Sequence, residues 1–174
     1  GRRKRSTLSA VSFLRNTIET AWKTKHHKVL SILALDLTSA FDNVSLQRLL
    51  YTLRRKGVAP WIIRFVESFL TERRTKTSFT GYKSEWYRAR TGIPQGSPLS
   101  PILFLFFASE LLEEFLTPQD NKIGFGFVDD TNLVAWGPSA EDNCRRLAEA
   151  HEKCLLWARR HGAAFNPTKY QLMH

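Results

Sequence analysis

Three aspartates of this chain have the surroundings that metal chemistry requires. Two of them, Asp129 and Asp130, are adjacent and lie between the apolar segments 127–128 and 133–136. Adjacent negative charges are unfavourable unless a cation lies beside them. Mg²⁺ suits this position, because it binds carboxylate oxygens and keeps coordination sites for water and substrate phosphates. The pair therefore predicts a divalent-metal site, with an ordinary polar hairpin tip as the alternative.

The third aspartate, Asp36, directly follows the apolar run 29–35, which has the composition of a buried strand. If that strand neighbours the segment that carries Asp129 and Asp130, the three carboxylates meet at one sheet edge. Three carboxylates can hold two metal ions roughly 3.5–4 Å apart, one at an attacking hydroxyl and one at a leaving pyrophosphate. The trio therefore predicts in-line phosphoryl transfer, with a plain helix cap as the alternative for Asp36.

The elements that must position these aspartates follow from periodicity and from turn residues. In chain order we expect a helix over 8–22, a buried strand over 29–35, helices over 46–53 and 60–69, strands over 77–80 and 86–90 joined through Gly81, a helix over 99–116, a hairpin over 122–136 with the acidic pair at its turn, a helix over 141–161, and a strand near Tyr170. This order predicts an α+β fold, an antiparallel sheet with helices packed on one face.

Two of these helices have a predicted buried stripe. In the first helix it consists of Leu8, Val11, Leu14, Ile18 and Trp22; in the last helix it consists of Cys144, Leu147, Ala150, Cys154 and Trp157. Both stripes follow from apolar residues at three- and four-residue steps, which lie on one side of a helix.

Composition limits the classes of function. The 174 residues are 43% hydrophobic, which is enough for one domain with a core. The formal net charge of +10 predicts a polyanionic partner, nucleic acid first and an anionic membrane second, with solubility as the bland alternative. No apolar run reaches the roughly 18 residues of a membrane-spanning helix, so we expect no membrane. Two cysteines give neither a disulfide framework nor a zinc spacing, which favours an intracellular compartment.

Four segments resemble the motifs of reverse transcriptases. Residues 34–44, Ala-Leu-Asp-Leu-Thr-Ser-Ala-Phe-Asp-Asn-Val, resemble the first palm motif, and residues 91–101 contain the Pro-Gln-Gly core of the second. Residues 127–130 are similar to the acidic-pair box, and residues 162–169 resemble the box that follows, with its Asn and Lys. The motifs occur in the family's order and span nearly the whole chain. The linking segments look most like those of fungal non-LTR retrotransposons.

The resemblance implies a polymerase palm with part of the fingers. Residues 1–28 and 44–91 would be fingers-side elements, and residues 29–43 and 92–174 would form the palm. The chain begins without Met and looks like a cut from a longer protein, so we expect the thumb, the N-terminal fingers and any endonuclease to lie outside it. The fragment alone is expected to polymerise weakly or not at all.

Roles at the metal site follow by position. Asp36, Asp129 and Asp130 would ligate two Mg²⁺ ions, which Mn²⁺ can replace, and Leu37 would offer its backbone carbonyl to the same site. Lys169 would lie near the triphosphate and protonate the leaving pyrophosphate. The alternative for Lys169 is a solvated lysine at the start of a strand.

Three further residues would shape the nucleotide pocket. The ring of Phe41 would stack under the incoming sugar and exclude a 2′-hydroxyl, so that deoxynucleotides are selected; plain core packing is the alternative. Gln95 and Gly96 would form the floor of the pocket, with Gly96 allowing close approach of the backbone. Their alternative is a structural turn before the following helix.

Basic residues would contact nucleic-acid phosphates. One expected group is Arg2, Arg3, Lys4 and Arg5 near the template backbone. A second strip would contain Arg73, Arg74, Lys76, Arg88 and Arg90. For any one of these residues, the alternative interpretation is an ordinary solvated charge on the surface.

The expected function is RNA-directed DNA polymerisation within a retrotransposon polyprotein. Its partners would be an RNA template, a DNA primer and dNTPs, together with the thumb and endonuclease of the same polyprotein. We expect a nuclear location in a eukaryotic host, because the template must be copied where genomic DNA is accessible. The alternatives are a non-catalytic nucleic-acid-binding relic and an RNA-templated RNA polymerase. Phe41 argues against the last of these.

Overall fold

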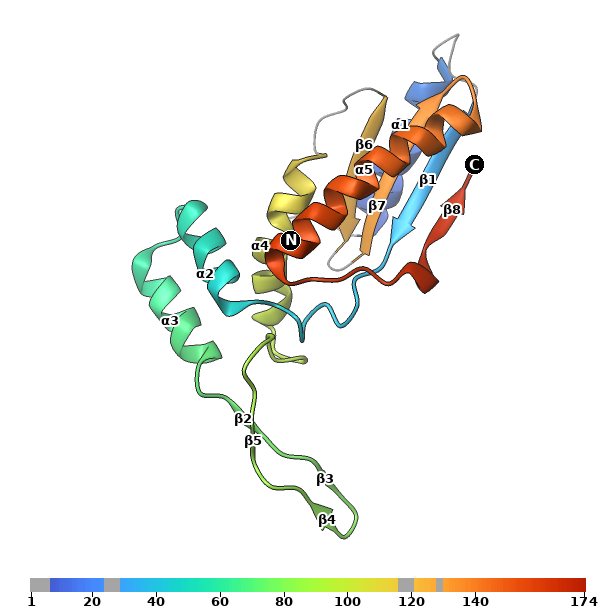
Figure 1. Ribbon diagram of the computed structural model, residues 1–174. Coiled ribbons are helices and arrows are strands. Elements are labelled where there is room, and N and C mark those ends of the chain that lie inside the picture. Colours follow the sequence, from blue (N-terminus) through green and yellow to red (C-terminus); the bar gives the residue numbers. More distant parts are fainter. Residues whose placement is uncertain (1–6, 24–28, 116–120, 128–129) are drawn as a thin grey trace. The chain divides into compact units, whose positions relative to one another are not determined.

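The computed structural model describes residues 7–23, 29–115, 121–127 and 130–174 (Figure 1). The chain divides into two compact units. The first contains the residues up to Thr38 together with Ala108–His174, and the second contains Ser39–Phe107. Among the described residues, no helix combines the length and the apolar character that crossing a membrane requires.

A four-stranded antiparallel sheet forms the centre of the first unit. Its strand order is β6-β7-β1-β8 (Figure 1), from β6 (Lys122–Phe127), β7 (Asp130–Gly137), β1 (Val29–Leu35) and β8 (Gln171–Met173). β1 and β7 are the inner strands, so their backbone groups pair on both sides. Their apolar runs fit this position, since inner strands covered on both faces need side chains without charge.

Helices cover both faces of this sheet. Asn143 of α5 (Ala140–His161) donates hydrogen bonds to the Val29 carbonyl and to the Ser31 hydroxyl, which places α5 on the face of Ser31. Phe13 of α1 (Thr7–Lys23) contacts the ring of Phe125 on the opposite face. The α+β prediction is confirmed, but its placement of the helices on one face is corrected, because α1 and α5 sandwich the sheet.

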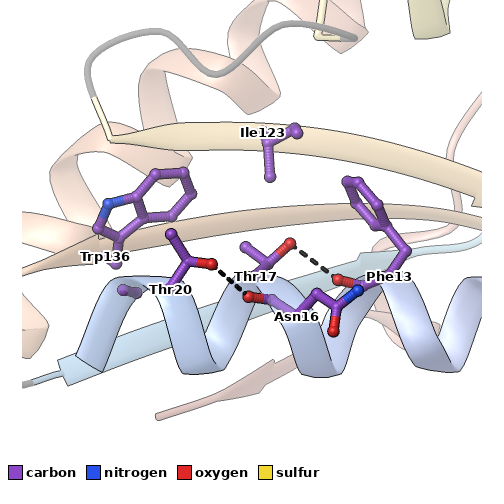
Figure 2. A pocket seen from close by; sticks show the side chains of 7 residues that line it. Phe13, Asn16, Thr17, Thr20, Ile123 and Trp136 are labelled. Carbon is purple, nitrogen blue, oxygen red and sulfur yellow. Dashed lines mark hydrogen bonds between the residues drawn. The ribbon is translucent and has the colours of Figure 1, made fainter. Parts of the chain in front are cut away.

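The contact between α1 and the sheet is loose. A cavity of about 270 Å³ lies between them, and Figure 2 shows Phe13 and Thr17 of α1 on one side and Ile123 and Trp136 on the other. The Thr17 hydroxyl donates to the Phe13 carbonyl of its own helix (2.9 Å), so it adds no bond to the sheet.

The predicted stripe of α1 is wrong at two positions. Val11 and Trp22 are 61% and 64% exposed, whereas Ala21 is buried. The helix therefore turns a face with Phe13, Thr17 and Ala21 toward the sheet. Periodicity alone did not distinguish this face from the neighbouring, more apolar one.

The long C-terminal helix α5 follows its sequence signals closely. The Ser139 hydroxyl accepts from the Asp142 amide at the first turn, and Gly162 ends the helix. Leu147, Ala150, Cys154 and Trp157 are buried as predicted, while Cys144 is only half-buried. Polar Asn143 and His161 are buried as well, and they hold hydrogen-bond partners within the unit.

The second unit begins with two helices. The helices α2 (Leu46–Arg55) and α3 (Pro60–Leu70) pack on each other through the buried residues Leu49, Leu53, Ile63, Val66 and Leu70. Ser45 caps the first of them, and Pro60 occupies the first turn of the second, where its missing N–H costs no hydrogen bond. The apolar helix α4 (Ser100–Glu113) follows later in the chain and runs from this unit into the first.

A two-stranded ribbon connects α3 to the loop before α4. Its outer pair is β2 (Arg74–Thr75) with β5 (Tyr87–Arg88), and its inner pair is β3 (Ser78–Phe79) with β4 (Tyr82–Lys83). The turn at Gly81 is confirmed, but the predicted pairing of 77–80 with 86–90 is wrong. The register shifts by one residue between the two pairs, so the second strand carries an extra residue there.

The buried amide of Asn143 generates a first prediction. Replacing Asn143 with Ala removes the donor to Val29 and Ser31 and leaves two acceptors inside the unit without it. We expect Asn143→Ala to lower the free energy of unfolding by about 1–3 kcal/mol, measured by urea denaturation. Glu152→Ala, an exposed position of the same helix, should change it by less than about 0.5 kcal/mol. Equal effects of the two substitutions would contradict this role.

Candidate active site

Strand pairing brings two of the three predicted metal ligands together. The ladder between β1 and β7 ends with Leu35 opposite Thr131. Asp36 directly follows the last residue of β1, and Asp130 is the first residue of β7. Asp36 and Asp130 therefore lie at the same end of this ladder, while Asp129 lies outside the described residues.

The Asp36 carboxylate has a cationic neighbour. Its Oδ2 atom is shielded from solvent and accepts no hydrogen bond from the described residues, but Lys169 Nζ lies 3.1 Å away. The side chains of Asp36 and Lys169 are 30% and 61% exposed, so the pair is partly screened by water. The prediction from sequence gave Lys169 a role at the triphosphate and did not foresee this ion pair.

The backbone around Asp36 is fixed by the segment that carries Lys169. The Asn166 amide donates to the Asp36 carbonyl (2.8 Å), next to the bridge between Leu37 and Phe165. The Asn166 side chain accepts from the Thr168 amide and hydroxyl, and so caps the short 3₁₀ helix η1 (Pro167–Lys169). Asn166 thus joins the end of β1 to the turn that carries Lys169.

These donors fit a divalent metal ion. A shielded carboxylate oxygen with no hydrogen bond has lone pairs available, and carboxylates are the ligands that Mg²⁺ and Mn²⁺ prefer. The bridge beside Asp36 uses the Asp36 carbonyl and the Thr38 amide, so the Leu37 carbonyl is not consumed by it. Within the described part of the chain, no group of three or more His, Cys, Asp or Glu side chains forms a metal site. The described part of the chain contains only two of the three predicted carboxylates, Asp36 and Asp130.

In the second unit, Phe41 lies against the core. Its ring stacks on the buried ring of Phe104, with centroids 5.2 Å apart and an interplanar angle of 22°. Its backbone carbonyl accepts from the Ile93 amide (2.8 Å). One face of the Phe41 ring is thus fixed by packing, and the side chain remains only half-buried.

The Pro-Gln-Gly loop is held against the first motif by several bonds. Gln95 Nε2 lies 3.3 Å from both carboxylate oxygens of Asp42, and the Gly92 amide donates to the Val44 carbonyl. Asp42 belongs to the first motif, residues 34–44, but it is not among the residues predicted for the site. Its two bonds with Gln95 are the part of this loop that sequence reasoning missed.

Gly92 and Gly96 both have a left-handed backbone, but only Gly92 makes a close backbone contact within the protein. Gly96 has a φ of 85°, which explains glycine there, but an added Cβ would meet no heavy atom within 4 Å. At Gly92, with a φ of 78°, a Cβ would lie 2.6 Å from the Asp42 carbonyl oxygen. The tight contact thus falls where the two motif segments meet.

The predicted phosphate contacts separate into two kinds of residue. Arg73 donates to the carbonyls of Leu70, Thr91 and Gly92, so its guanidinium is held by the main chain. Arg74 is exposed on the ribbon. The predicted group Arg2, Arg3, Lys4 and Arg5 lies outside the described residues.

Comparison with known proteins identifies the family. A family model described as reverse transcriptase (RNA-dependent DNA polymerase) matches residues 2–174. The chain therefore belongs to the reverse transcriptase family, whose members use divalent metal ions.

Sequence relatives come from mobile elements. The RNA-directed DNA polymerase from mobile element jockey of Drosophila melanogaster is 32% identical over 140 residues, 78% of this chain and 15% of that protein. The Pol polyprotein from a type-1 retrotransposable element R2 of Popillia japonica is 27% identical over 150 residues, 82% of this chain and 24% of that protein. The chain thus spans less than a quarter of these relatives. They support the non-LTR retrotransposon resemblance, whereas nothing supports its fungal leaning.

Solved structures show the same fold. The apo telomerase of Candida tropicalis, truncated from its C-terminal domain, superposes with a TM-score of 0.74 over 97% of this chain and 35% of that chain, at 17% identity. The telomerase of Candida albicans in complex with a fragment of telomeric RNA gives a TM-score of 0.72 at 14% identity, over 98% of this chain and 32% of that one. These likenesses confirm the polymerase palm and fingers architecture.

The close contact at Gly92 generates a second prediction. Gly92→Ala combines a left-handed φ with a clash against the Asp42 backbone, whereas Gly57→Ala has a φ of 73° and no neighbour within 4 Å. We expect Gly57→Ala to lower the free energy of unfolding by about 1 kcal/mol and Gly92→Ala by at least about 1 kcal/mol more. Urea denaturation measures both, and equal losses would show that the contact with Asp42 is unimportant.

Proposed function

We propose that the protein containing this chain is an RNA-directed DNA polymerase, which transfers deoxynucleotides to a primer 3′-hydroxyl within a retrotransposon polyprotein. Membership of the reverse transcriptase family supports this activity. The single structural observation that supports it is the β1–β7 register, whose end at Leu35 and Thr131 has Asp36 and Asp130 as the next residues; Asp129 adjoins Asp130 in the sequence. Two carboxylates at one strand end, with a third adjacent, match the requirement for a metal-assisted phosphoryl transfer.

The metal ligands in this proposal are Asp36, Asp129, Asp130 and the Leu37 carbonyl. They would hold two Mg²⁺ ions, or Mn²⁺ in their place, which neutralise charge on the attacking and leaving oxygens when bound. Lys169 is proposed as the general acid for the pyrophosphate. Its ammonium lies on a half-exposed, flexible side chain beside Asp36, so it is close to the reacting groups and free to reorient.

The nucleotide pocket in this proposal is formed by Phe41, Gln95 and Gly96. The stack on Phe104 keeps the Phe41 ring from yielding, which a steric filter against a 2′-hydroxyl requires. Gln95 is oriented by Asp42, and its loop gains its shape from Gly92 and Gly96. These residues would position the sugar and base rather than take part in proton transfer.

The proposed partners are an RNA template, a DNA primer and dNTPs, with the thumb and endonuclease of the same polyprotein. The net charge of +10 supports contact with nucleic-acid backbones, including contacts by Arg2, Arg3, Lys4 and Arg5. A nuclear location would give such an enzyme access to genomic DNA.

A third prediction tests the metal ligands. Asp129→Asn keeps the size of the side chain but removes its charge, so divalent cations should bind far more weakly. We expect primer extension on an RNA template with Mg²⁺ or Mn²⁺ to fall by well over about 100-fold, more than is typical for loss of an outer-shell partner. Asp142→Asn, in the first turn of α5, is the matched control and should retain activity. Full activity of Asp129→Asn, with an unchanged melting temperature, would rule out the ligand assignment.

A fourth prediction tests the sugar filter. Phe41→Ala opens space beside the 2′-position, so the preference for dNTPs over NTPs should fall by about 10-fold or more, as expected for one lost steric contact. Phe41→Tyr retains the ring and should keep the preference. Single-nucleotide incorporation kinetics with matched dNTP and NTP give the ratio. An unchanged ratio in Phe41→Ala would mean that the ring serves packing alone.

A further inference from the structure

The ribbon of residues 72–90, which we call the arm, contains none of the proposed metal ligands and none of the residues proposed for the nucleotide pocket. Figure 1 shows it as an extended hairpin that leaves the end of α3 and returns toward α4. Every residue of its four short strands is exposed. A ribbon without buried strand residues gains little from its own core, so its side chains are available for a ligand.

The arm carries an unfavourable concentration of positive charge. Six Lys or Arg residues face only two Glu residues within 72–90. Arg74 and Arg88 are directly opposite each other in the β2–β5 pair, and like charges in such positions destabilise a hairpin. Glu72 offsets this in part, at 3.7 Å from Arg88. Arg74 and Arg90 have no carboxylate within ion-pair distance among the described residues. An anionic ligand would relieve this repulsion.

These arginines share a hollow at the base of the arm. Arg74, Arg88 and Arg90 line a wide concavity of about 830 Å³ together with Gln95 and Asp42. Arg73 also borders it, but its guanidinium is bonded to main-chain carbonyls and makes the base of the arm rigid. The hollow is therefore lined by three arginines besides Arg73, and guanidinium groups favour phosphate because their planar donors match its oxygens.

Exposed aromatic rings follow the charges along the arm. The residues Phe79, Tyr82, Trp86 and Tyr87 are 62%, 49%, 59% and 55% exposed. Phe79 stacks on Tyr82 across the turn (4.9 Å between centroids), and Lys76 Nζ lies 4.9 Å from the centre of the Trp86 ring. Rings that are preoriented in this way and still open to solvent offer flat surfaces on which bases can stack.

We propose that the arm binds single-stranded nucleic acid. Arg74, Arg88 and Arg90 contact the phosphates, and Trp86 and the Phe79–Tyr82 pair stack on unpaired bases. A duplex cannot use these rings, because its bases already stack on one another. The inference rests on the proposed function only in naming a template strand as the natural ligand, and the binding itself requires neither a metal ion nor catalysis.

The test measures binding by fluorescence anisotropy with the full-length protein in EDTA. The probes are one labelled RNA strand of about 20 nucleotides, longer than the site size of one small binding module, the DNA strand of the same sequence, and the RNA duplex. Comparison of the RNA strand with the DNA strand shows which of the two nucleic acids the arm binds more tightly. Vesicles of anionic lipid and the oligomeric state of the protein are measured in parallel.

Two double variants separate charge from stacking. Arg74→Ala with Arg88→Ala should weaken single-strand binding by about 10-fold or more. The slope of the logarithm of the binding constant against the logarithm of the salt concentration should become shallower by about 1–2. Because these changes remove a like-charge pair, the arm should be no less stable, and lost binding does not reflect unfolding. Phe79→Ala with Trp86→Ala should weaken single-strand binding by about 10-fold or more and leave duplex binding unchanged.

Matched controls come from the neighbouring helices. Trp61→Ala removes an equally exposed ring on α3, and Arg48→Ala with Arg54→Ala removes two exposed charges on α2. Both should bind like the wild type. Asp129→Asn should also bind like the wild type, so loss of polymerase activity leaves this inference standing.

Three results would overturn the inference. One is single-strand binding by the arm variants that is as tight as that of the wild type. Another is a loss of duplex binding in the ring variant that equals its loss of single-strand binding. Vesicle binding or self-association that depends on Trp86, without single-strand binding, would assign the arm to a membrane or to a second copy of the chain. If single-strand binding fails this test while primer extension persists, only the role of the arm is refuted.

Discussion

The antiparallel register of β1 and β7 is the constraint on which the site depends. Seven residue pairs fix it, from Val29 with Gly137 to Leu35 with Thr131. A slip of one residue would turn every side chain of β1 to the other face and separate Asp36 from Asp130. Leu133, Val134 and Ala135 are buried, so both faces of β7 are covered and such a slip is excluded by packing. The geometry of the acidic edge is therefore secured by the apolar core behind it.

A second constraint joins the two motifs of the other unit. The segment after Phe41 runs beside the Pro-Gln-Gly loop, with backbone bonds at Ile93 and Gly92. Arg73 adds bonds to the same loop from the start of the arm. The loop has no regular secondary structure, yet its position is determined by main-chain contacts. An irregular segment is thereby held in a defined position.

Much of the fold could be predicted because its signals are local. The run 29–35 is uniformly apolar, and β1 has those bounds; the capped and Gly-terminated α5 begins one residue before its predicted start. The errors arise where a choice depends on distant residues. The buried side of α1 depends on what the sheet offers, so Thr17 and Ala21 face it in place of Val11 and Trp22. Polar Asn143 is buried because Val29 and Ser31 supply its partners.

The candidate site shows the same contrast between features with a local sequence signal and features that depend on distant residues. The resemblance to the family's motifs marked Asp36, Gln95 and Lys169 as individual residues. The bonds of Asp42 with Gln95 and of Lys169 with Asp36, however, join residues far apart in sequence. No periodicity encodes such pairs. The one-residue shift in the arm was missed for a related reason, since a turn at Gly81 does not reveal where an extra residue enters a strand.

The ion pair of Lys169 with Asp36 has a consequence for the proposed metal site. The lysine acts as a resident counter-ion, so the acidic edge is partly neutralised before any metal arrives. Lys169 would give up Asp36 when a divalent ion binds there, and its ammonium would then be available to a phosphate. In the proposed site, Asp36 and Lys169 would thus hold the metal ion and a phosphate in turn, and Asn166, whose backbone bonds to both residues, would keep the two side chains close together.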